Sequence, residues 1–414
     1  MSISIKAKYK KGLFARKIAI DQFMKFVGDI NVEGEYDAEL LKFGDHDFEM
    51  RICPNGTLHF HVTETLLEAS SVTSIAGPGF HKAVIDILES LEHKMVVHFD
   101  IQDPTDYQNT KGFGQLQKEH TKDLRELLTS ILKERTPESL HTDYLAWSNP
   151  WYPTQAYEIV TPFGSYTQQM IESYLQGSSF LEFAQSYFVW FDEGKTPLYH
   201  KQIALFQLWN QYKWRKPVTQ EEANLIRSII RHLEVARMVE PTITLPHAIW
   251  QEICANNGIP YLNLNEEADM DQPNIGYLRH DVHYLLPMNY GLKASGAYAL
   301  SNDDGAMLLR DIGRTIRIQI VPEAMPGQVM DPRNMLEAVD FQEEIDGYAY
   351  VGQFKEQEAD HGTLHILQAF IQGSTSYANV MMMYQNPEDK AWAMDTLKKI
   401  ETPSGIPFSL YNLS

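Results

Sequence analysis

The stretch FEMRICPNGTLHFHVTE, residues 48–64, decides how the first part of the chain folds. Apolar and polar residues alternate on both sides of Pro54-Asn55-Gly56, with the two-residue period of β-strands that bury one face. The central residues are typical of a tight turn, in which we expect Gly56 to supply a positive φ. The stretch therefore predicts a β-hairpin with one apolar and one polar face.

The segments around this hairpin extend it into a sheet. Residues 3–10 alternate apolar side chains with serine and lysine, which indicates a half-buried strand rather than a targeting peptide. Residues 71–77 predict another strand, and MVVHFD, residues 95–100, predicts a further one. Apolar residues at helical spacing predict helices over 80–94 and 115–133. Together they predict an N-terminal α/β sheet domain.

Gly77-Pro78-Gly79 lies where a strand gives way to a helix, the position at which glycine-rich loops bind phosphate. The spacing matches no phosphate-binding motif, and proline removes one backbone donor. The motif therefore predicts a structural turn.

The 414 residues exceed the size at which single hydrophobic cores stop growing, about 250 residues, so we expect several domains. The fold class that the sequence predicts is α+β multidomain, with an N-terminal α/β sheet domain, an all-α middle segment and a C-terminal antiparallel α/β sandwich. The expected boundaries are 1–138 for the N-terminal domain, 139–166 for an aromatic and proline-rich linker, 167–258 for the helical domain, 259–274 for an acidic linker and 275–414 for the C-terminal domain.

The segment HILQAFIQGSTSYANVMMMYQNPEDKAWAMDTLKKI, residues 365–400, has two long strands followed by an Asn-Pro-Glu-Asp helix start and a closing helix. Over roughly the last third of the chain this arrangement resembles PsbP-like α/β sandwich domains. The resemblance implies a non-enzymatic adaptor or assembly factor. It assigns no binding residue to this chain.

Four residues of the N-terminal domain are candidate metal ligands. His59 and His61 lie two apart on one predicted strand, and His98 and Asp100 lie two apart on another. Each pair projects from one face of its strand, so adjacent strands would bring three imidazoles and a carboxylate together. Such a set suits zinc or another transition metal and would make the protein a metal-dependent hydrolase. The alternative is that they are polar residues at the polar positions of an open sheet face.

The charge of the chain limits its partners. Acidic residues outnumber basic ones by 55 to 35, which gives a net charge of −20. This excess disfavours general affinity for nucleic acid or membrane surfaces and favours a basic partner. The charge is polarised, because the first 17 residues carry six basic and no acidic side chains, whereas residues from Gly258 onward carry ten basic and 22 acidic ones.

Two cysteines, Cys53 and Cys254, indicate no disulfide framework and suit a reducing compartment. We find no apolar run near the roughly 18 residues that a membrane span needs. Walker A, GxSxG, HExxH, CxxC and kinase motifs are absent, although catalytic triads are recognised by geometry rather than by motif.

The leading interpretation is a non-enzymatic, cytoplasmic protein-binding protein without a cofactor. Its specific form is a bacterial immunity or antitoxin-like inhibitor of a basic partner. The hydrolase above and a structural scaffold that self-associates are the alternatives.

Overall fold

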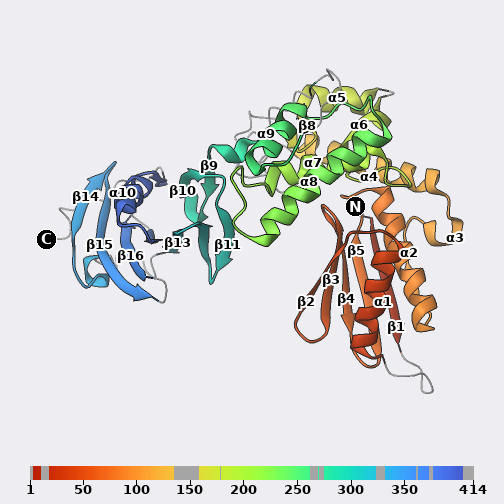
Figure 1. Cartoon of the computed structure of the whole chain (residues 1–414), viewed down its shortest axis with the longest axis horizontal. Helices are drawn as coiled ribbons and strands as arrows, with labels where there is room; N and C mark the ends of the chain where they lie inside the picture. Colours follow the sequence, from red (N-terminus) through yellow and green to blue (C-terminus); the bar gives the residue numbers. More distant parts are fainter. Residues whose placement is uncertain are drawn as a thin grey trace. The chain divides into compact units, whose positions relative to one another are not determined.

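The structure is a computed structural model that describes residues 3–10, 18–134, 158–177, 179–261, 269, 275–322, 332–359, 362–372 and 376–403. The chain divides into two compact units, one with the described residues up to Ile275 and one with those from Gly276 onward. The first unit contains the N-terminal sheet and the helical segment, and the second contains the C-terminal sheets (Figure 1). The predicted class, α+β multidomain, is confirmed.

Six antiparallel strands form the N-terminal sheet in the order β2-β3-β4-β5-β1-β6. The strands are β1 (Ser4–Lys10), β2 (Glu39–Phe43), β3 (Asp47–Cys53), β4 (Gly56–Val62), β5 (Leu66–Val72) and β6 (Asp100–Gln102). The N-terminal strand β1 lies between β5 and β6, more than 55 residues away from either in sequence. The order places β6 at one edge, with the two strands β5 and β1 between it and β4.

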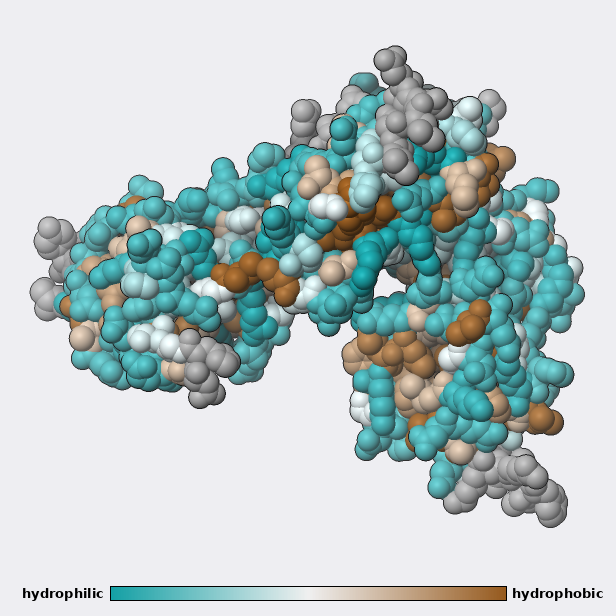
Figure 2. Space-filling model, viewed as in Figure 1, coloured by the Kyte–Doolittle hydropathy of each residue, from teal (hydrophilic) through white to brown (hydrophobic). Residues whose placement is uncertain are grey.

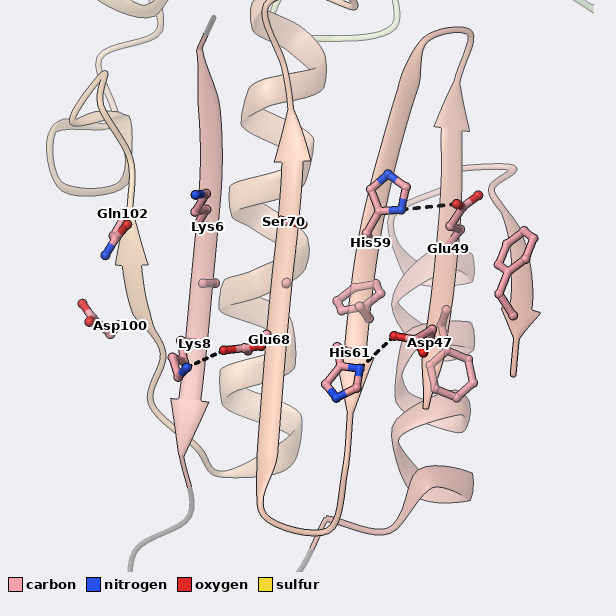
Figure 3. A pocket seen from close by; sticks show the side chains of 15 residues that line it. Lys6, Lys8, Asp47, Glu49, His59, His61, Glu68, Ser70, Asp100 and Gln102 are labelled. Carbon is pink, nitrogen blue, oxygen red and sulfur yellow. Dashed lines mark hydrogen bonds and ion pairs between the residues drawn. The ribbon is translucent and has the colours of Figure 1, made fainter. Parts of the chain in front are cut away.

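Helices cover one face of this sheet. The long helices are α1 (Ile20–Glu33) and α2 (Pro78–Met95), and both lie behind the strands in Figure 3. The Phe23 ring of α1 packs on Phe48 and Phe60 with centroid distances of 5.5 and 5.2 Å. Because side chains alternate along a strand, burial of these residues turns their polar neighbours to the other face.

The predicted hairpin is formed by β3 and β4, with one correction at its turn. The positive φ belongs to Asn55, at 58°, and not to Gly56. Gly56 is required for space, because a Cβ there would lie 2.5 Å from Cys53 Sγ.

Gly77-Pro78-Gly79 forms the joint between the sheet and the helical segment. Gly79 N–H donates to Trp190 O, and Trp190 N–H donates to Ala76 O, both at 2.9 Å. A Cβ on Gly79 would lie 2.1 Å from the Trp190 ring, so only glycine allows this approach. The motif is a structural turn, as the sequence predicts.

The helical segment follows α3 (Tyr107–Thr110) and α4 (Phe113–Glu134). Its elements are the β7 (Glu158–Thr161) and β8 (Gly164–Thr167) hairpin, α5 (Gln168–Gln176), α6 (Phe180–Tyr187), α7 (Pro197–Asn210), α8 (Gln220–Val239) and α9 (His247–Asn257). Thr219 caps α8 by accepting from Glu222 N–H at 3.2 Å. Trp250 and Leu233 belong to the buried core that α7, α8 and α9 share.

The second unit is built on a seven-stranded antiparallel sheet in the order β11-β12-β13-β17-β16-β15-β14. These strands are β11 (Ala299–Asp303), β12 (Ala306–Asp311), β13 (Arg314–Pro322), β14 (Phe341–Ile345), β15 (Tyr348–Ala359), β16 (Gly362–Gln372) and β17 (Ser376–Tyr384). A second sheet has the order β18-β10-β9, with β9 (Asp281–Leu285), β10 (Gly291–Ser295) and β18 (Ile400–Glu401). Helix α10 (Lys390–Lys398) precedes β18.

The predicted linkers 139–166 and 259–274 lie largely outside the described residues, apart from the β7–β8 hairpin, residues 259–261 and Asp269. Within the described parts of the chain, no helix has the length and apolar character needed to cross a membrane. The visible surface of the second unit is mainly hydrophilic, with small separate apolar patches (Figure 2).

Two helical glycines give a matched test of the joint. We expect Gly79→Ala to lower the free energy of unfolding by about 1–3 kcal/mol, because the new methyl group overpacks against Trp190. Gly28→Ala in α1, where no atom lies within 4 Å of the added Cβ, should raise it by about 0.5–1 kcal/mol. Urea unfolding followed by tryptophan fluorescence measures both. Equal effects of the two substitutions would contradict the assigned joint.

Candidate functional site

The face of the N-terminal sheet opposite the helices carries polar side chains in two rows that run across the strands. The strand registers define one row as Gln102, Lys6, Ser70, His59 and Glu49. They define the other as Asp100, Lys8, Glu68, His61, Asp47 and Phe43. Members of a row are cross-strand neighbours, whose Cβ atoms lie roughly 4.5–5.5 Å apart.

Ion pairs join neighbours within these rows. Lys8 Nζ donates to Glu68, and this hydrogen bond lowers the pKa of the Glu68 carboxyl. The Nδ1 atom of His61 lies 2.8 Å from Asp47 Oδ1. The Nδ1 atom of His59 lies 3.3 Å from Glu49 Oε1. Each histidine is therefore oriented by a carboxylate on β3 and keeps its Nε2 atom available (Figure 3).

The rows line a hollow of about 540 Å³ on this face. Ser70 lies between Lys6 and His59, and its short side chain leaves space between these longer ones (Figure 3). A volume of this size is within the range of about 300–1,000 Å³ that ligand sites occupy. The hollow is the candidate functional site.

The four predicted metal ligands do not meet in it. His59 and His61 lie on β4 and Asp100 on β6, three strand spacings apart, which is roughly 14 Å at about 4.8 Å per spacing. Metal–ligand bonds are only about 2.0–2.3 Å long, so one ion cannot be bound by both strands. The described residues contain no group of three or more His, Cys, Asp or Glu side chains placed to hold a metal ion.

His98 departs from the prediction for a local reason. Helix α2 runs to Met95 and ends at Val96 in the left-handed conformation with φ 54°, so the strand begins only at Asp100. His98 therefore lies in the connection, with 90% of its side chain exposed and its Nδ1 atom 3.0 Å from Glu92 Oε1. It lies outside the polar rows.

Ser70, His59 and Glu49 follow one another in the order of a hydrolase triad. A nucleophilic serine must donate its hydroxyl proton to the histidine, and no hydrogen bond joins these two described residues. Backbone N–H groups in the middle of a sheet are paired with neighbouring strands, which leaves few donors for an oxyanion. The three described residues therefore do not have the geometry of a hydrolase triad.

A second cluster of chemically active side chains is buried where β5, α2 and the segment after β6 meet. His81 is fully buried, with Nδ1 2.9 Å from Thr73 Oγ1 and Nε2 3.2 Å from Asp103 Oδ1. Asp103 also accepts from the backbone N–H groups of Thr105 and Gln108, at 2.9 and 3.0 Å. With only 3% of the Asp103 side chain exposed, the cluster stabilises the fold rather than meeting a substrate.

Electrostatics within this cluster favour one charge state. Burial alone would raise the pKa of the Asp103 carboxyl, but the hydrogen bonds with His81, Gln108 and Thr105 outweigh it, and the pKa lies well below its usual range. Burial, and then His81, lower the pKa of His120 far below its usual range. The neutral His120 ring packs edge-on to His81 at 5.5 Å, and its two nitrogens have no hydrogen-bond partner among the described residues.

A histidine pair in the helical segment joins α7 to α8. The Nδ1 atoms of His200 and His232 lie 2.8 Å apart, so one ring must donate and the other accept. The pKa of each ring is lowered, mainly by burial. For His232 the pKa is lowered to about 3. This neutral pair was not predicted from the sequence, since its members lie 32 residues apart.

Comparisons with known proteins add no function to this site. No protein-family model matches the chain, and no curated protein matches it. A solved structure from Bacteroides thetaiotaomicron VPI-5482 aligns with a TM-score of 0.27 and 8% sequence identity over 30% of this chain. The aligned part is 49% of that protein, about half its length, and a similarity this low supports neither a shared fold nor a shared function. The PsbP-like resemblance stays a prediction.

Asp103 makes stability depend on pH. The pKa of Asp103 is lower in the folded chain than in the unfolded chain. The ionised carboxylate therefore stabilises the fold above about pH 3.9, which is its unfolded pKa, and this stabilisation is lost as the pH falls below that value. We expect Asp103→Asn to lower the free energy of unfolding by about 1–3 kcal/mol at neutral pH. The free energy of unfolding of this variant should also decrease less steeply than that of the wild type as the pH becomes acidic. Denaturant unfolding at neutral and acidic pH measures this. Asp45→Asn, at an exposed turn, is the control and should keep the wild-type slope.

Proposed function

We propose that this protein is a non-enzymatic, cytoplasmic binding protein whose partner is another, positively charged protein. Its specific form would be an inhibitor of the bacterial immunity or antitoxin kind that covers a basic toxin or nuclease. The net charge of −20 supports a basic partner. Both cysteines are free, which fits a reducing compartment.

The observation that carries the proposal is the acidic edge of the seven-stranded sheet. Strand β14 is the last strand and pairs with β15 alone among the described strands. Five carboxylates lie on or beside it: Glu337, Asp340, Glu343, Glu344 and Asp346. An edge strand offers unpaired main-chain donors and acceptors to an added strand, and the carboxylates select one that carries Lys or Arg.

The carboxylates of this edge differ in their availability. Lys355 pairs with Glu337 at 3.0 Å, and Lys398 pairs with Glu343 at 3.2 Å. Glu344 and Asp346 are exposed and make no ion pair within the described part of the chain. Their charges remain for a partner, which makes them the residues to test.

Among the alternatives, the metal-dependent hydrolase lacks its ligand set, because β4 and β6 are separated in the sheet. Self-association as a scaffold stays a prediction. Light scattering over a range of protein concentrations tests it.

A double variant, Glu344→Gln with Asp346→Asn, tests the acidic edge. Affinity capture with the full chain should retain basic proteins that are released by about 0.5 M salt, since salt screens exposed charges. The double variant should reduce their recovery about fivefold or more, equivalent to about 1 kcal/mol of binding free energy.

The matched control removes the same charge from the opposite edge. Asp303→Asn with Asp304→Asn, exposed where β11 joins β12, should retain wild-type capture. Recovery that resists salt, captured proteins that are not basic, or equal losses in the two double variants would each rule out the proposed edge.

A further inference from the structure

We propose that the hollow on the N-terminal sheet is a binding site for a small carboxylate ligand, centred on Ser70 between Lys6 and His59. This site is separate from the acidic edge that carries the proposed function and lies in the other unit. Either proposal can fail without the other.

The strand registers place the three donors in one line. Lys6 on β1 is opposite Ser70 on β5, and Ser70 is opposite His59 on β4. With strands about 4.8 Å apart, the backbones of Lys6 and His59 are separated by roughly 10 Å. Figure 3 shows Ser70 between them, at the place where the short side chain leaves room for a group the size of a carboxylate.

Of the two lysines that line the hollow, Lys6 is the one whose charge is not paired within the described residues. Lys8 is bound to Glu68, and Arg51 lies 3.4 Å from Glu49. Lys6 makes no ion pair with any described residue, although its side chain is exposed beside the hollow. An ammonium next to a serine hydroxyl is a pair of donors that suits an anion.

His59 adds a third donor when it is protonated. Glu49, 3.3 Å from Nδ1, favours the N–H on that atom, so the neutral ring has only a lone pair at Nε2. A second proton converts Nε2 into a donor directed away from Glu49. Binding should therefore be stronger when the His59 ring is protonated. The other charged groups around this ring are Lys6, Arg51, His61 and Glu68.

The surroundings select a monoanion. Asp100 lies on β6 diagonally from Lys6 and makes no ion pair within the described residues, and Glu68 and Glu49 border the same hollow. A doubly charged phosphate is repelled by these carboxylates, and attracted by Lys6, about twice as strongly as a singly charged carboxylate at the same distance, and the carboxylates outnumber Lys6. A carboxylate is therefore the class of ligand that this site fits.

Titration of the full chain with sodium acetate at constant ionic strength tests the site, followed by NMR of histidine labelled with carbon-13 in the ring. The His59 ring signals should shift and saturate at millimolar acetate, with tighter binding at lower than at higher pH. Inorganic phosphate at the higher pH should bind more weakly than acetate. Shifts that never saturate, or that chloride reproduces, would overturn the proposal.

Matched variants assign the binding to Lys6. Lys6→Met should weaken acetate binding about threefold to fivefold, whereas Lys6→Arg should retain it. Lys25→Met removes an equal charge from the exposed side of α1, on the other face of the sheet, and should change binding less than about twofold. Asp100→Asn should strengthen it. Equal losses in Lys6→Met and Lys25→Met would show general charge attraction instead of a site and would refute the proposal.

Discussion

The apolar face of the N-terminal sheet must be buried, and this requirement sets the position of every side chain in the hollow. Phe48 and Phe60 pack on Phe23 of α1, and this contact fixes which residues of β3 and β4 face the core and which face solvent. A shift of one residue in either strand would place histidines in the core and phenylalanines in water. The polar rows are therefore a consequence of core packing, and a ligand site built on them needs no separate scaffold.

The sequence was sufficient for the local features and insufficient for the long-range ones. The hairpin of β3 and β4 and its two faces could be predicted, because turn chemistry and alternation are local. The pairing of β1 with β5 and β6 could not, since these strands pair across more than 55 residues. The metal prediction failed at this point: His59 and Asp100 share a face but not an adjacent strand.

Two other differences have the same origin. The sequence from Arg333 to Glu344 predicts a helix, but the structure has a short 3₁₀ turn, Pro332–Met335, and then β14 there, because pairing with β15 outweighs local propensity. The buried cluster of Thr73, His81 and Asp103 gathers from separate segments. No local pattern distinguishes His81 from a surface histidine, although its position in an otherwise apolar helix face is the one signal present.

The two proposed sites carry unpaired charges of opposite sign, although the chain as a whole has an excess of negative charge. At the β14 edge, Glu344 and Asp346 make no ion pair with any described residue, so their charges would attract a cationic partner. On the N-terminal sheet, Lys8, His59 and His61 each have a carboxylate neighbour, and the charge of Lys6 remains. A cationic partner and an anionic ligand would thus bind different units. Salt should weaken the first more strongly, because several exposed charges act together there, whereas the second depends on one ammonium and short-range hydrogen bonds.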